Sequence, residues 1–186
     1  MICGNVTQWQ RIIFDPLSWI DESRVMIPDY FSQDTCRAVI NQVVIEQMAL
    51  ATEEIPHSDD MLACLFIDEW FFLRQAALLM ACQRHRANLA INGRLQELPA
   101  SARQFAGFPL LNSHFRQGDR LLSSSELAQC ALQELLVFSP ELPIALRQRI
   151  PLLFADFTAT NCYTDPLFTA DSGLLILAIQ HAKRNS

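Results

Sequence analysis

Residues 61–83 read MLACLFIDEWFFLRQAALLMACQ, and this stretch decides the fold. It contains neither Gly nor Pro and is rich in Leu, Ala and Met, which are strong helix formers. Ser58 can cap a helix start ahead of it, and the two acidic residues that follow Ser58 favour the positive end of the helix dipole. We therefore expect helices over about 59–70 and 73–91, joined by a kink or turn. One continuous bent helix is the alternative, because no proline enforces the break.

Three further segments carry helix signals, at about 34–51, 124–138 and 171–184. Ser123 and Glu126 form a capping box ahead of the second segment. In the first segment apolar residues recur at helical spacing and should face the core, namely Cys36, Val39, Ile40 and Val43. The third segment is apolar nearly all round, so we expect it to be central. Four residues should then be buried together: Leu135, Leu175, Leu177 and Ala178.

The remaining signals also favour helices over strands. Asn92-Gly93 is typical of a helix stop, and a helix that starts at Ser139-Pro140 should end before Pro151. No hairpin signal or sustained alternation of apolar and polar residues is present. The pattern predicts an all-α protein, a single compact multi-helix domain over 1–186 with no substantial β-sheet. Within it, residues 1–30 should form an aromatic-rich N-terminal segment packed on or beside the core.

The composition allows a substantial core and narrows the choice of partners. Hydrophobic residues make up 51% of the 186 residues and charged residues 18%, so intrinsic disorder is disfavoured. The formal net charge of −6 argues against nonspecific binding to nucleic acid or to anionic membranes, because both depend on positive charge. We therefore expect no nucleic-acid partner and no direct membrane insertion.

Six cysteines lie at positions 3, 36, 64, 82, 130 and 162. No two of them form a C-x-x-C pair, and the pattern is typical of reduced, buried thiols rather than of a disulfide framework. The first residues lack a basic region followed by an apolar run, so no secretory signal is expected. The apolar run at 174–179 is far shorter than the ~20 residues that a membrane-spanning helix needs. We expect a cytoplasmic protein whose membrane association, if any, comes through a partner.

No set of residues has the spacing of a catalytic or metal site. Cys82 and His85 lie three apart, but a zinc site needs about four ligands and no second Cys/His pair matches. His57, Ser58 and Asp59 are the residue types of a hydrolase triad, but neighbours in sequence cannot converge as nucleophile, base and orienting group. No glycine motif for phosphate binding is present. We expect no catalytic residue, no metal and no cofactor.

Two clusters are candidates for protein binding. The first lies in WQRIIFDPLSWI, residues 9–20, and its candidate contact residues are Trp9, Arg11, Phe14, Asp15 and Trp19. The second is Arg147 with Arg149, which complement a helix C-terminus and can also bind a carboxylate of a partner. Interface energy concentrates in Trp and Arg anchors. An aromatic segment that packs onto its own core is an equally good interpretation, and both can be true.

The same two stretches carry a family resemblance. Residues 9–20 resemble the start of the cytosolic accessory proteins of type III secretion, the OrgA/MxiK/SctK family. The stretch LPIALRQRIPLLF, residues 142–154, resembles the family's other dense motif. Weaker similarity covers 82–90 and 177–183. These are motifs of fold and assembly rather than of chemistry.

The resemblance implies a non-enzymatic adaptor, without a cofactor, in the cytoplasmic sorting platform beneath the type III secretion injectisome. Such proteins link the cytoplasmic domains of the inner-membrane ring to the platform's spoke-forming protein and, through it, to the ATPase complex. The implied location is cytoplasmic, peripheral to the inner membrane through protein partners. Two alternatives stay open: a type III secretion chaperone, which typically contains strands, and an uncharacterised helical enzyme.

Overall fold

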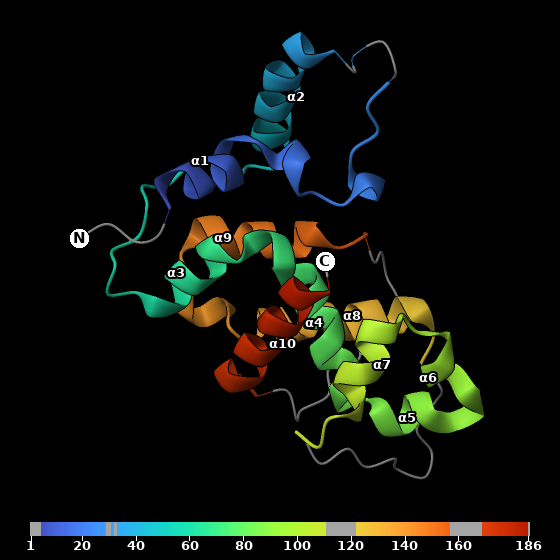
Figure 1. Ribbon diagram of the computed structural model, residues 1–186. Helices are drawn as coiled ribbons and strands as arrows, with labels where there is room; N and C mark the ends of the chain where they lie inside the picture. Colours follow the sequence, from blue (N-terminus) through green and yellow to red (C-terminus); the bar gives the residue numbers. More distant parts are fainter. Residues whose placement is uncertain (1–4, 29–30, 32, 111–121, 157–168, 186) are drawn as a thin grey trace. The chain divides into compact units, whose positions relative to one another are not determined.

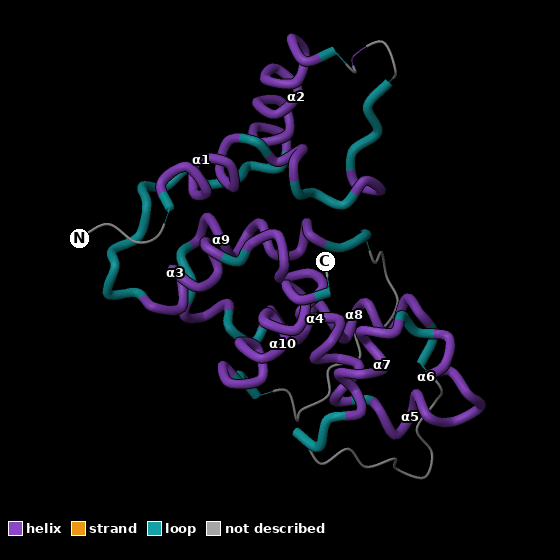
Figure 2. The backbone as a smooth tube through the Cα atoms, in the orientation of Figure 1, coloured by secondary structure: helices purple, strands orange, loops and turns teal. Residues whose placement is uncertain are grey.

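The computed structural model describes residues 5–28, 31, 33–110, 122–156 and 169–185, and their regular elements are helices (Figure 1). These residues form ten α-helices and several short 3-10 helices. No β-strand occurs in this part of the chain (Figure 2). The all-α prediction is therefore confirmed for the described residues.

The chain divides into two compact units. Unit 1 consists of residues 1–71 and 139–156, and unit 2 consists of residues 72–138 and 157–186. The boundary falls inside helix α4 (Trp70–Arg84), so this helix contributes residues to both units. The single domain over 1–186 stays a prediction.

Unit 1 combines two ranges that are far apart in the sequence. Its elements are α1 (Val6–Phe14), η1 (Pro16–Ser18), η2 (Glu22–Arg24), α2 (Asp34–Gln47), α3 (Met61–Asp68), η5 (Ser139–Glu141), α9 (Ile144–Arg149) and η6 (Ile150–Leu153). Asn5 caps α1, because its side chain accepts from the backbone N–H groups of Thr7 and Gln8. Pro16 occupies the first position of η1, where its fixed φ suits a helix start. Helix α1 packs against α2 and α3.

Helix α2 buries a different face from the one predicted. Val39 is 64% exposed and Val43 is also exposed, whereas Asn41, Val44 and Ile45 are buried. Asn41 can be buried because its side chain accepts from Leu17 N–H at 3.0 Å and donates to Asp15 Oδ1 at 2.7 Å. Because apolar residues lie on more than one side of this helix, their periodicity alone did not identify the buried face.

The 59–91 segment contains three helices rather than one or two. Helix α3 ends at Asp68, α4 follows after Glu69, and α5 (Arg86–Ala90) follows after His85. The cap of α3 is Asp60, whose side chain accepts from Ala63 N–H at 2.9 Å, and not Ser58. The predicted break near residue 70 is present at Glu69, whereas the break at His85 was not predicted, because no Gly or Pro marks that position in the sequence.

Unit 2 holds the remaining helices. Besides most of α4, they are α5, η4 (Ile91–Gly93), α6 (Arg94–Glu97), α7 (Ala100–Gly107), α8 (Ser124–Leu136) and α10 (Ser172–Arg184).

The helix stop at Gly93 is confirmed, since this glycine has a positive φ of 72°. The capping box of Ser123 and Glu126 at α8 is confirmed as well. Of the four residues expected in the core, Leu135, Leu175 and Ala178 are buried, but Leu177 is 45% exposed.

A buried ion pair joins α4 to α8 in unit 2. Arg84 Nε donates to Glu134 Oε1 at 2.5 Å, and Arg84 Nη2 donates to Glu134 Oε2 at 3.0 Å. Glu134 is fully buried. Burial raises the pKa of the Glu134 carboxyl, and the Arg84 guanidinium opposes this shift. The bidentate geometry supplies a partner for a charge that would otherwise be costly to bury.

The prediction of reduced, buried thiols holds for Cys82 and Cys130, holds only in part for the half-buried Cys36, and is wrong for Cys64. Cys36, Cys82 and Cys130 are free thiols, and burial raises the pKa of Cys82 to about 12. Cys64 is disulfide-bonded. Spacing along the chain does not reveal which thiols the fold brings into bonding range. Cys3 and Cys162 lie outside the described residues.

None of the helices in the described part of the chain combines the length and the apolar character needed to cross a bilayer.

Candidate protein-binding surface

The two stretches 9–20 and 142–154 meet in unit 1 around one buried side chain, Arg149. Its guanidinium donates over 2.8 to 3.3 Å to four main-chain oxygens, those of Ile12, Ile13, Ala51 and Ala145. The side chain therefore ties α1, the segment after α2 and α9 to one point. We call these contacts the Arg149 joint.

The Arg149 joint holds a positive charge away from water. Burial lowers the pKa of Arg149 to about 10, and the carboxylate of Glu53 partly opposes this shift. The group stays protonated at neutral pH, because that pKa is still well above 7. A buried cation needs acceptors for its N–H groups, and the four carbonyls supply them. Arg149 thus has a structural role, and it has no exposed surface through which to touch a partner.

Trp19 belongs to the same joint. Its Nε1–H donates to Ile12 O at 3.1 Å, the oxygen that also accepts from Arg149 Nε. Its ring meets Trp70 edge to face, with centroids 5.4 Å apart. Such aromatic pairs are stabilising beyond the area they bury.

Replacing Trp19 by Phe should therefore lower the free energy of unfolding of the protein by about 1–2 kcal/mol, since the indole donor is lost while most of the ring remains. Urea unfolding followed by circular dichroism measures this change. Unaltered stability would show that the Trp19–Ile12 hydrogen bond contributes nothing.

Segment 20–24 is also attached to the second stretch. Asp21 N–H donates to Leu152 O at 2.9 Å. The Arg24 side chain donates to three main-chain oxygens, those of Pro151, Phe154 and Ala155. The residues directly after 9–20 therefore extend the contact that Arg149 makes between the two stretches.

The outer side of α1 remains open to a partner. Trp9 is only 4% exposed and faces inward, whereas Phe14 is 55% exposed. Arg11 is exposed, and its guanidinium lies 4.4 Å from the centroid of the Phe71 ring. Thr7, Arg11 and Phe14 follow the i, i+4, i+7 spacing of one helix face. We call Thr7, Arg11, Phe14 and Phe71 the α1 outer face.

Asp15 and Arg147 differ in how exposed their side chains are to a partner. Asp15 is half-buried, and its carboxylate accepts from Arg37 Nη2 at 2.9 Å and from Asn41 Nδ2 at 2.7 Å. These bonds attach the C-terminal end of α1 to α2. Arg147 is exposed on α9. Of the seven residues predicted to bind a partner, Trp9, Trp19 and Arg149 are buried, and Arg11, Phe14 and Arg147 are exposed. That any of them binds a partner stays a prediction.

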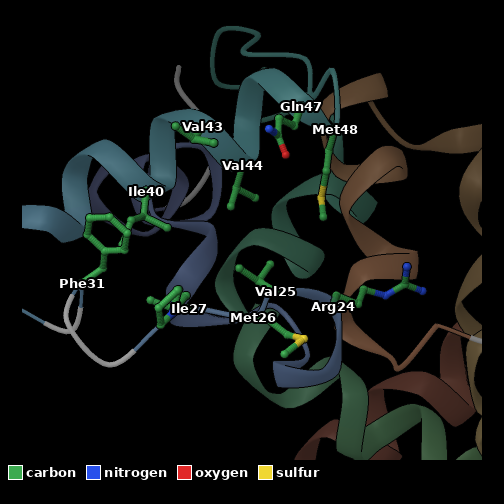
Figure 3. A pocket seen from close by; sticks show the side chains of 11 residues that line it. Arg24, Val25, Met26, Ile27, Phe31, Ile40, Val43, Val44, Gln47 and Met48 are labelled. Carbon is green, nitrogen blue, oxygen red and sulfur yellow. The ribbon is translucent and has the colours of Figure 1, made fainter.

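Sequence reasoning missed an open apolar hollow in unit 1, which we call the α2 groove. It has a volume of about 280 Å³ and lies between α2 and the segment after η2 (Figure 3). Its lining includes Met26, Ile27, Phe31, Ile40 and Val43. Met26 is 95% exposed. The sequence feature that indicates this groove is the run Val25-Met26-Ile27, which is apolar but lies outside the predicted helices.

The described residues contain no group of three or more His, Cys, Asp or Glu side chains placed to hold a metal ion. The absence of a metal and of a catalytic residue stays a prediction. The exposed residues of the described chain include Phe14, Met26, Arg11 and Arg147, and aromatic, Met and Arg side chains are enriched at protein interfaces.

Comparison with known proteins decides the family. The model of a family described as "Bacterial type III secretion apparatus protein (OrgA_MxiK)" matches residues 9–184. The chain belongs to this family. The match includes both stretches of the Arg149 joint, so the OrgA_MxiK resemblance read from residues 9–20 and 142–154 is confirmed.

Relatives in the OrgA_MxiK family cover most of the chain. The "Oxygen-regulated invasion protein OrgA" of Salmonella typhimurium, strains LT2 and SL1344, is 35% identical over 181 residues, which are 95% of this chain and 87% of the relative. The "Putative uncharacterized protein YgeO" of Escherichia coli K12 is 30% identical over 121 residues, 64% of this chain and 84% of that protein. No solved structure matches the chain significantly.

Proposed function

We propose that the protein is a non-enzymatic adaptor of the sorting platform of a type III secretion injectisome. In this role it links the cytoplasmic domains of the inner-membrane ring to the spoke-forming protein and, through that protein, to the ATPase complex. It acts in the cytoplasm, peripheral to the inner membrane through these protein partners. The family match over 9–184 is the observation that carries the proposal.

The α1 outer face is the first surface that we propose for this role. The Arg11 side chain makes no hydrogen bond or ion pair with the described residues, and its guanidinium lies 4.4 Å from the centroid of the Phe71 ring. Its N–H groups are therefore free to receive a carboxylate in the fork geometry that arginine favours. Phe14 supplies exposed aromatic area beside it, and aromatic and Arg side chains are the usual anchors of an interface.

Replacing Arg11 or Phe14 by Ala should weaken partner capture by about 1–3 kcal/mol each and leave the melting temperature largely unchanged, because both side chains are exposed. Capture is measured by co-purification and by titration with the purified ring domain and spoke-forming protein of the same system. Glu141→Ala, which removes an exposed charge elsewhere in unit 1, is the matched control.

The variant Trp9→Ala distinguishes a role of the N-terminal segment in partner binding from a role in core packing. Trp9 is buried, so this change should lower the melting temperature, and capture should fall only in proportion to the unfolded fraction. Full capture by folded Arg11→Ala and Phe14→Ala proteins would exclude the α1 outer face, and Arg147 would be the next residue to test. Failure of the wild-type protein to bind either partner would overturn the adaptor function itself.

A further inference from the structure

Unit 2 contains a second hollow that the proposed α1 surface does not use. It has a volume of about 130 Å³ and lies between the C-terminal end of α7 and one face of α10. Leu177, Gln180, His181 and Arg184 line it from α10, where their spacing of three and four places them on one face. Phe105 and Phe108 line the opposite side. We call this hollow the α7–α10 pocket.

The wall of the α7–α10 pocket is a cluster of three rings. The Phe105 ring lies 6.0 Å from that of Phe108 and 5.3 Å from that of His181, and the rings of Phe108 and His181 are 6.0 Å apart. Phe105 is buried, whereas Phe108 and Leu177 are exposed. The pocket therefore combines a buried floor with an accessible apolar rim, and concave, mostly apolar lining is typical of binding sites.

Hydrogen bonds hold this wall in place. The main-chain oxygen of Phe108 accepts from Gln83 Nε2 at 2.5 Å and from Arg86 Nη1 at 3.1 Å. His181 Nε2 lies 3.0 Å from Ser101 O, and it must be the donor because a carbonyl only accepts. A wall that is already ordered loses little conformational entropy when a ligand binds.

The charge at the α7–α10 pocket is positive. Arg184 is exposed at its edge, and its guanidinium has no hydrogen bond or ion pair within the described residues. The described lining contains no Asp or Glu. Arg184 complements the C-terminal end of the α10 dipole, and its exposed guanidinium has the fork geometry that pairs with a carboxylate.

We propose that the α7–α10 pocket binds an acidic segment of a protein partner, in which a Leu or Phe side chain is flanked by Asp or Glu. The apolar side chain enters between Phe108 and Leu177, and a flanking carboxylate pairs with Arg184. The volume is of the right order for one such side chain, since an apolar cavity of about 150 Å³ accommodates benzene. This proposal rests on the proposed function and gives the adaptor a second docking surface, in unit 2.

The test uses the full chain and two blocked tetrapeptides, Asp-Phe-Leu-Asp and Lys-Phe-Leu-Lys. Amide resonances of the protein are followed by NMR during each titration. The acidic peptide should shift the resonances of Leu177, His181 and Arg184, and it should bind at least ~5-fold more tightly than the basic peptide. Arg184→Glu should weaken binding of the acidic peptide at least ~10-fold. Equal binding of both peptides, or shifts centred elsewhere, would overturn the proposal.

Lys183→Glu is the matched control, because it makes the same charge change one residue away. Lys183 does not line the α7–α10 pocket, and its Nζ lies 5.7 Å from the Phe72 ring centroid. Lys183→Glu should change the affinity for the acidic peptide less than ~3-fold. An equal loss of affinity in both variants would show that the net charge of the protein, and not Arg184, attracts the peptide. That result would contradict the proposal.

Partner capture then separates this proposal from the adaptor function. If the peptide binds as expected but the wild-type protein captures neither ring nor spoke protein, the adaptor function fails and the pocket stands. If the partners are captured but the peptide does not bind at Arg184, the pocket proposal alone is overturned.

Discussion

Replacing Arg149 by Met should lower the free energy of unfolding of the protein by about 3 kcal/mol. The main-chain oxygens of Ile13 and Ala51 each lose a buried charged donor, and a buried acceptor left without a partner costs about 1–3 kcal/mol. Met fills part of the volume, so the loss comes mainly from hydrogen bonds. Urea unfolding followed by circular dichroism measures the change.

Arg147→Met is the matched control for this experiment. Arg147 lies two residues away on the same helix and is exposed, so its replacement should change the free energy of unfolding by no more than about 0.5 kcal/mol. Arg149→Lys should fail to restore stability, because a single ammonium group cannot reproduce the planar fork that reaches α1, α9 and Ala51 together. Equal stability of the Arg147 and Arg149 variants would contradict a structural role for the Arg149 joint.

Replacing Arg84 by Met should lower the free energy of unfolding at neutral pH by about 3–5 kcal/mol. The change leaves the Glu134 carboxylate buried without its bidentate partner, and uncompensated buried charges have costs of this size. The double variant Arg84→Met/Glu134→Leu removes both charges and should recover most of the loss. A double-mutant cycle gives the coupling energy of the pair directly.

The loss in Arg84→Met should depend on pH. Burial raises the pKa of Glu134, and without Arg84 that pKa should rise further, because the opposing contribution is gone. A carboxyl whose pKa is higher folded than unfolded contributes stability that is fully present below the unfolded pKa and is lost as pH rises through the folded pKa. The deficit of Arg84→Met relative to wild type should therefore be smaller near pH 5 than near pH 7. A deficit that stays constant between these pH values would mean that Glu134 does not titrate as the burial implies.

Local signals predicted many of the helices. The capping box of Ser123 with Glu126 and the stop at Gly93 act within three or four residues, so the sequence displays them complete. The breaks at Glu69 and His85 carry no such signal. Their positions depend on which residues of 59–91 the surrounding helices bury, and a single segment does not contain that information.

The residues predicted to bind a partner differ in burial. The sequence identifies 9–20 and 142–154 as two motifs of the family resemblance, but it reveals neither that they meet nor which of their residues face inward. Trp9 and Arg149 are the residue types of an interface, yet they are buried, whereas Arg11 and Phe14 lie outside. Trp and Arg anchor cores and interfaces alike, so only the neighbours in space distinguish the two roles.

The sequence by itself determined the helical class, several helix boundaries and the family, because periodicity, caps and motifs are properties of short segments. Tertiary structure alone decided which faces are buried. Arg149 Nε reaches Ile12 O across 137 residues of sequence, and the α2 groove and the α7–α10 pocket likewise lie between separate segments. Burial is a property of segments in contact, and no local pattern specifies which segments will meet.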